Sequence, residues 1–274
     1  MGVLIAAGLL HAAVYSMGVR EWEDPLSFRK ATLFGLSTGV TLWSLLWVIS
    51  KLEPHRWDGL LRYGLCVALV IEVGLISLQT WRGETSHFNR SGAINQAIET
   101  GMTICITLAM LGILWVMTLV TLGRFQSGIA EETKEAIRWG MGFLLVSGLL
   151  GYAITGLGYT RISQGDSPGI WPPRGVLKFP HGAALHAIQV LGILAWWTQR
   201  AGSTKGVRIV RIASLAHALW LVFAVYQTAN GHARFEMDPL GLVFAIATFL
   251  CAGWVFMELV PTFRHAVLGP PDRP

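Results

Sequence analysis

Residues 101–122 read GMTICITLAMLGILWVMTLVTL, a run without a single charged side chain. An α-helix of this length reaches across the hydrocarbon core of a bilayer, which is roughly 30 Å thick. Comparable apolar runs recur along the whole chain, and the candidate spans are 2–17, 31–50, 60–80, 96–122, 137–158, 181–198, 209–228 and 240–260. We therefore predict an all-α, polytopic transmembrane bundle of about eight spans. Because the first run is short, seven spans is the alternative.

The composition points to the same class of protein. Only 14% of the residues are charged, 53% are hydrophobic and the mean hydropathy is +0.52, whereas about a quarter of a soluble domain is charged. The net charge of +5 comes from Lys and Arg that stand singly between apolar runs, as in membrane loops. We expect one integral membrane domain over residues 1–274, with the lipid bilayer as partner and no nucleic acid.

The loops predict an orientation and a location for a site. With eight spans, more Lys and Arg fall on the side of the N-terminus, notably in the acid-free segment 200–211. The positive-inside rule then places both termini in the cytoplasm, in a bacterial inner membrane. The loops 81–95, 159–180 and 229–239 fall on the other side and hold most of the Gly, Pro and polar loop residues, so we expect any site to open to the outer face.

Three histidines lie inside predicted spans: His11, His186 and His217. His11 and His217 fall at a similar depth on different helices. Neutral imidazoles in that arrangement are what the two axial positions of a b-type haem require. These three histidines are therefore our candidates for binding a haem or another metal, and the competing interpretation is a set of interhelical hydrogen bonds.

Glu72 falls near the middle of the span 60–80, where an unpaired charge is costly. Its position predicts a protonated acid that serves as a proton relay or in a quinone site, with a carboxyl bonded across helices as the alternative. Gln189 follows His186 by three residues and shares its helix face, and His87 belongs to the polar loop 81–95. We take Glu72, His87 and Gln189 as candidate catalytic residues.

A short internal match links two helix ends. LQTWRG at 78–83 and YQTANG at 226–231 share a glutamine, a threonine and a glycine. Such a match predicts duplicated halves with equivalent helix ends. Taken alone, it is short enough to arise by chance.

Two motifs carry a resemblance to a known family. The chain reads QTWRGETSHFN at 79–89 and HGAALHAIQ at 181–189. It resembles a family of uncharacterised bacterial multi-pass membrane proteins whose motifs read Q-x-x-R-G-x-x-S-H-F-N and H-x-x-G-x-H-x-x-Q. The glycine of the second motif is displaced here to Gly182, and the resemblance extends loosely from 60 to 232. It implies candidate positions and no reaction.

A weaker similarity is to haem A synthase, an eight-span family built from duplicated halves. Glu84 and His87 are spaced as in the first four positions of its outer E-x-x-H-R motif. Arg90 comes two residues late, the motif follows the third span, and the fourth span has no histidine. The similarity therefore supports only the expectation of a haem.

Three functions remain open from the sequence. The leading hypothesis is a membrane redox or haem-associated protein, with a quinone or other membrane redox subunits as partners. The alternatives are a transporter or channel with a polar path around Glu72, and an accessory subunit of a respiratory or photosynthetic complex. The chain has no P-loop, nucleophile-elbow, HEXXH or Rossmann signature, and the sequence leaves open whether it is an enzyme.

Overall fold

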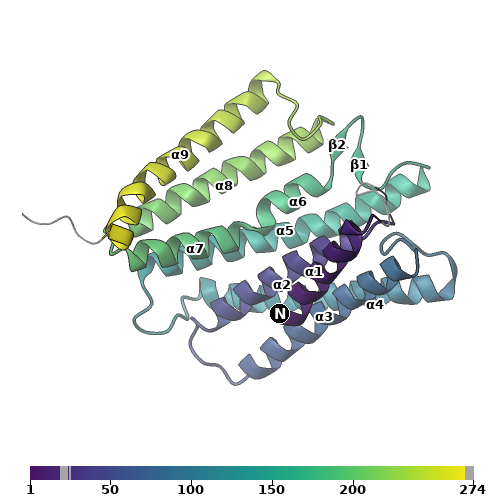
Figure 1. The fold of residues 1–274 in the computed structure, drawn as a ribbon, viewed down its shortest axis with the longest axis horizontal. Coiled ribbons are helices and arrows are strands. Elements are labelled where there is room, and N and C mark those ends of the chain that lie inside the picture. Colours follow the sequence, from purple (N-terminus) through teal and green to yellow (C-terminus); the bar gives the residue numbers. More distant parts are fainter. Residues whose placement is uncertain (19–23, 25, 269–274) are drawn as a thin grey trace, which may run out of the picture. The chain divides into compact units, whose positions relative to one another are not determined.

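The computed structural model describes residues 1–18, 24 and 26–268, with the side chains of residues up to 260 (Figure 1). Most of this chain is helical. The elements in order are α1 Gly2–Ser16, α2 Arg29–Ile49, α3 Asp58–Trp81, α4 Gly92–Thr121, α5 Glu131–Ser163, β1 Ile170–Trp171, β2 Gly175–Val176, α6 Lys178–Leu185, α7 Ala187–Arg200, α8 Gly206–Ala229 and α9 Pro239–Leu268. The expected all-α bundle is confirmed, apart from the short antiparallel hairpin β1–β2.

The predicted number of eight spans is not confirmed. Among the described residues, six helices are long and apolar enough to cross a membrane, namely α2, α3, α4, α5, α8 and α9. The predicted span 2–17 is the 15-residue helix α1, which is too short to qualify. The predicted span 181–198 is divided between α6 and α7, because the backbone of His186 leaves the helical conformation at φ −94° and ψ 3°. Hydropathy detects an apolar run but not a break in the helical backbone within it.

The described chain forms two compact units, here called the N-terminal unit (residues 1–124) and the C-terminal unit (from residue 125). In the N-terminal unit α1 packs on α2, α2 on α3, and α3 on α4. In the C-terminal unit α5 packs on α6 and α7, these two pack on α8, and α8 packs on α9. Each unit thus has the same order of neighbouring helices, with α6 and α7 together in the place of α2.

Glycines set the closest helix approaches inside each unit. Gly8 of α1 and Gly35 of α2 pack backbone to backbone, so that a Cβ on Gly35 would lie 2.7 Å from the Cα of Gly8. In the C-terminal unit, a Cβ on Gly140 of α5 would lie 2.9 Å from the Cα of Ile188 on α7. Such small-residue contacts are the usual way for helices to pack in lipid, where no hydrophobic force draws them together.

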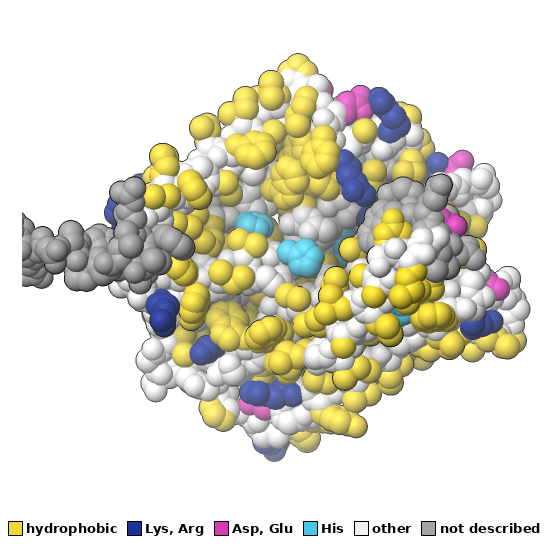
Figure 2. Space-filling view, in the orientation of Figure 1, with side chains coloured by type: hydrophobic (Ala, Val, Ile, Leu, Met, Phe, Trp, Pro, Cys, Tyr) yellow, Lys and Arg dark blue, Asp and Glu magenta, His cyan; other side chains and the backbone are white. Residues whose placement is uncertain are grey.

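The surface agrees with a membrane environment. Figure 2 shows hydrophobic side chains over most of the visible face and few charged ones. On α9 the side chains of Phe249, Leu250 and Phe256 are each about two-thirds exposed or more. An apolar surface of this extent would aggregate in water, whereas in lipid it costs nothing. The chain is therefore built as a multi-pass membrane protein.

Candidate functional site

The end of α3 is tied to the start of α4 by a buried glutamine. Gln79 is fully buried, and its Nε2 donates a hydrogen bond to Asn95 Oδ1 over 3.1 Å. Arg82 donates from one guanidinium nitrogen to both Gln79 Oε1, at 2.5 Å, and Asn95 Oδ1, at 3.0 Å. Each polar atom of the glutamine side chain is thus bonded, as burial requires.

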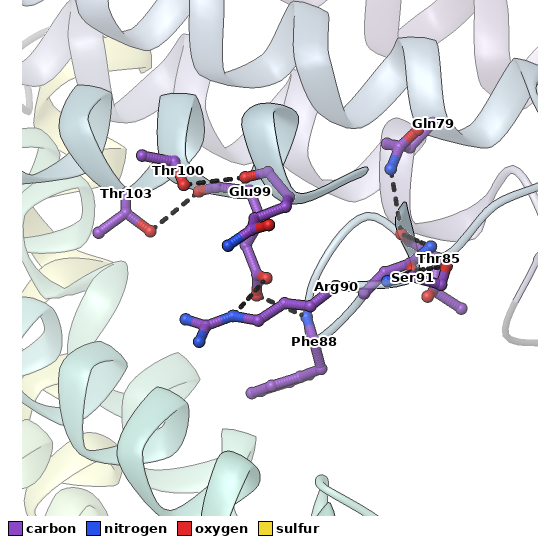
Figure 3. A network of polar contacts seen from close by, with 10 residues as sticks. Gln79, Thr85, Phe88, Arg90, Ser91, Glu99, Thr100 and Thr103 are labelled. Carbon is purple, nitrogen blue, oxygen red and sulfur yellow. Dashed lines mark hydrogen bonds and ion pairs between the residues drawn. The ribbon is translucent and has the colours of Figure 1, made fainter. Parts of the chain in front are cut away.

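The loop between these helices is held by a second acid of α4. Glu99 is buried, and its carboxylate accepts the backbone N–H of Phe88 at 3.0 Å and the Arg90 guanidinium at 3.2 Å (Figure 3). Phe88 adopts the left-handed conformation with φ +61°, which costs on the order of 1–3 kcal/mol for a residue other than glycine. The hydrogen bond from its own amide to Glu99 helps to hold the residue in this conformation.

The predicted His87 lies in this loop beside its motif neighbours. Its Nδ1 is 3.2 Å from Ser86 Oγ, and its ring lies 5.9 Å from that of Phe34 on α2. Asn89 donates to Glu84 at 2.9 Å and accepts from the Ser91 hydroxyl. We call the set Gln79, Arg82, Glu84, Ser86, His87, Phe88, Asn89, Arg90, Ser91, Asn95 and Glu99 the polar loop network.

The motif at 79–89 had placed Gln79, Arg82 and the loop residues up to Asn89 among the candidate positions, with His87 as the predicted catalytic residue. Asn95 and Glu99, which connect the loop to α4, were missed. Their spacing was the signal that could have identified them. Asn95 and Glu99 are four residues apart, so they share a helix face, and they stand at the start of an apolar run.

The C-terminal unit repeats the helix end of α3. Gln227 of α8 is also fully buried, and Gly231 has φ +68° where Gly83 has φ +69°. In each case the residue after the glycine donates its amide to the glutamine carbonyl, at 3.0 Å for Glu84 and 2.9 Å for His232. The short sequence match corresponds to two helix ends of the same geometry. The same glycine cap also ends α4, α5 and α7, at Gly123, Gly165 and Gly202, so it is the common helix end of this chain.

The loop after α8 is bonded differently from its counterpart. His232 Nδ1 lies 2.9 Å from Gln227 Oε1, and Gln227 Nε2 donates to the carbonyl of Glu236. Arg174, in the turn of the β-hairpin, pairs with Glu236 at 2.7 Å. A hydrogen bond from the Ala233 amide, helped by the Arg174 charge, lowers the pKa of Glu236.

Asp238 makes the stability of the fold depend on pH. Its carboxylate accepts from the Tyr226 hydroxyl and from the Gly241 amide, which lowers its pKa below the ordinary 3.8. A carboxyl whose pKa is lower in the folded state stabilises the fold above its unfolded pKa, and this contribution is lost as the pH falls through the folded value. We expect thermal stability in detergent to fall on acidification below about pH 4. Asp238→Asn should reduce this loss of thermal stability on acidification. An unchanged loss would contradict the assignment.

Both ring nitrogens of His11 are hydrogen-bonded to neighbouring residues. The side chain is 3% exposed; Nδ1 donates to the Ala7 carbonyl at 2.7 Å, and Nε2 accepts from Trp81 Nε1 at 3.1 Å. The ring also stacks on Phe28 at 5.9 Å. Both nitrogens of His11 therefore have partners within the N-terminal unit, whereas His217 belongs to the C-terminal unit.

In His217 and in His181, one ring nitrogen is hydrogen-bonded to a backbone carbonyl. Nδ1 of His217 bonds the Ala213 carbonyl at 3.0 Å, and Nδ1 of His181 bonds the Ser147 carbonyl at 2.8 Å. Since a carbonyl only accepts, both Nδ1 atoms carry the proton in the neutral ring, and both Nε2 atoms keep a lone pair. Among the described residues, neither Nε2 has a hydrogen-bond partner.

His186 lies at the same level of the C-terminal unit as His217. Along α5, Gly140 faces Ile188 and Ser147 contacts His181, so that α5 runs antiparallel to α6 and α7. By this register His186 lies beside residues 142 and 143, and Phe143 contacts the His217 ring at 6.1 Å. The His186 side chain is exposed at the helix break, and Gln189 is half-buried one turn further along α7.

Glu72 belongs to the N-terminal unit, whereas His181, His186 and His217 belong to the C-terminal unit. It is 6% exposed on the buried face of α3 that also carries Gln79. Within the described part of the chain, no group of three or more His, Cys, Asp or Glu side chains could hold a metal ion. The described residues thus offer histidine pairs and two buried acids, Glu72 and Glu99.

No protein-family model, curated protein or solved structure matches the chain.

Proposed function

We propose that the protein is an integral membrane redox protein whose C-terminal unit holds a b-type haem, with His217 and His186 as the axial ligands. The observation that carries the proposal is the state of His217: its Nδ1–H is bound by a carbonyl of its own helix and its Nε2 is unoccupied among the described residues. That hydrogen bond fixes the tautomer and orientation that a metal-ligating imidazole needs.

The choice of His186 as second ligand rests on its register and exposure. It stands at the level of His217, on the helix pair α6–α7 that packs against α8. No hydrogen bond to its ring is found among the described residues, and its side chain is exposed at the helix break. His11, the partner predicted from depth, is disfavoured because Trp81 already donates to its Nε2.

The surroundings of these two histidines suit a macrocycle. Phe143 contacts the His217 ring, and Phe143, Ala184, Ala187 and Ala213 belong to one buried hydrophobic cluster, so the environment is apolar. A bound haem would supply a one-electron redox centre, and the residues of this chain would hold it and exclude water. We propose a quinone or another membrane redox subunit as electron partner, and a bacterial inner membrane with cytoplasmic termini as location.

Absorption spectroscopy of detergent-purified protein from a haem-replete host tests the proposal. We expect a Soret band that sharpens on reduction. His217→Ala and His186→Ala should each lose the haem or convert it from six- to five-coordinate, whereas His55→Ala and His11→Ala should keep the wild-type spectrum.

Exogenous imidazole separates a lost ligand from a lost fold. Added to folded His217→Ala protein, it should restore the six-coordinate spectrum. Absence of any Soret absorbance in the wild type would refute the haem, and loss of haem in His11→Ala would refute the chosen ligand pair.

A further inference from the structure

The acids of the N-terminal unit differ in whether their charge is compensated. Among the acidic side chains whose burial is described, Glu72 and Glu99 are the buried ones, at 6% and 8% exposure. Glu99 pairs with Arg90 and accepts a backbone amide. The carboxyl of Glu72 has neither a salt bridge nor a hydrogen bond within the described residues. Ionisation is therefore supported at Glu99 and unsupported at Glu72.

The helices packed around Glu72 bring no positive charge to it. α3 packs against α2 and α4, with a smaller contact to α1. Along these helices Lys and Arg occur only at the ends, as Arg29 and Lys30 of α2 and Arg62 of α3. Of the remaining titratable groups, the Cys105 thiol of α4 interacts electrostatically with Glu72. The other titratable side chains on these helices are His11 and Tyr15 of α1, Asp58, Tyr63 and Cys66 of α3, and Glu99 of α4. His11 is bonded to Trp81.

An apolar layer lies between Glu72 and the polar loop network. Ile76 of α3 packs with Ile98 and Met102 of α4, and all three are buried. On α3 the order along the helix is Glu72, Ile76 and then Gln79. On α4 it is Cys105, Met102 and then Asn95, and Asn95 bonds Gln79. The acid thus lies one apolar layer, about a helical turn thick, below a hydrogen-bonded network that reaches the surface.

We propose that Glu72 is a proton-binding site of the N-terminal unit, neutral at rest, which takes up and releases one proton. Uptake forms an O–H bond on one carboxylate oxygen, and release breaks the same bond and leaves the carboxylate. An unpaired carboxylate at the centre of a span costs several kcal/mol, which makes the neutral acid the resting form. No second acid is buried beside it among the described residues, which favours a proton over a metal cation. This proposal is independent of the haem.

Infrared difference spectroscopy of the full-length protein in lipid tests the assignment directly. At neutral pH the wild type should show the carbonyl stretch of a protonated carboxylic acid, which shifts in D2O. Glu72→Gln should lack this band and Glu99→Gln, the matched buried acid, should retain it. Glu72→Asp should keep a shifted band. All variants are checked for folding by size-exclusion profile, and Glu72→Gln should keep any Soret band of the wild type.

Two titrations separate a reversible proton site from its competitors. Raising the pH should convert the band reversibly into carboxylate absorption, and adding Na⁺ at constant pH should leave the band unchanged. A wild type without the band, or a Glu72→Gln protein that retains it, would overturn the assignment. A band that stays constant at every pH where the protein is folded would show a purely structural acid, and a band lost on adding Na⁺ would show a cation site; either result rejects the proposal.

Discussion

Gly231→Ala is expected to destabilise the protein strongly, whereas Gly83→Ala should have a modest effect. The two glycines end α8 and α3 in the same way, with φ values of +68° and +69°. Alanine in this conformation costs about 1–2 kcal/mol at either position. A Cβ at Gly83 meets no atom within 4 Å, but at Gly231 it would lie 2.1 Å from the backbone carbonyl oxygen of Pro172.

The clash at Gly231 cannot be relieved without moving backbone that is held by hydrogen bonds. The segment before β2 is fastened to the same helix end, since the Arg174 amide donates to the Gly231 carbonyl at 2.9 Å and the Thr228 hydroxyl donates to the Val176 carbonyl at 3.1 Å. We expect Gly231→Ala to cost more than about 3 kcal/mol, in the range of severe single substitutions. Thermal unfolding of the two variants in one detergent measures the difference directly. Equal losses would show that the hairpin does not lie against the end of α8.

The transmembrane class followed from composition because lipid-facing helices need apolar side chains all round. This is why the six long helices were found almost at their true positions. The number of spans was harder to predict, since it depended on the length of α1 and on one residue, His186. The break at His186 sits in a run that hydropathy reads as continuous, and nothing local in the sequence marks it.

The candidate sites show the same limit. Glu72 could be picked out because a charge inside an apolar run stands out in any sequence. The hydrogen bond that occupies His11 joins it to Trp81, 70 residues further along the chain, and only the packing of the helices reveals it. The glutamines of the two helix ends lay in a visible match, but their burial and their bonds were outside what the match alone could support.

Gly35→Ala is expected to release α1 from α2. A Cβ at this position would lie 2.7 Å from both the Cα and the N of Gly8 and 2.9 Å from the Leu4 carbonyl oxygen. All three atoms are backbone, so the two helices must move apart for the side chain to fit. The matched control is Gly74→Ala on α3, where a Cβ meets nothing within 4 Å. That variant should be neutral or stabilising, because alanine favours the helix over glycine by about 1 kcal/mol.

The consequences of Gly35→Ala should concentrate in α1. At 15 residues, this helix is too short to count as a span by itself and depends on its contact with α2. Displacement would also strain the bond between His11 and Trp81. We expect a loss of more than about 2 kcal/mol, as for other overpacked contacts. Thermal unfolding should show this loss, and hydrogen exchange should show faster exchange of the amides in residues 2–16, while α8 stays protected. If Gly35→Ala and Gly74→Ala unfold at the same temperature with equal protection of α1, the close contact between α1 and α2 is absent in the folded protein.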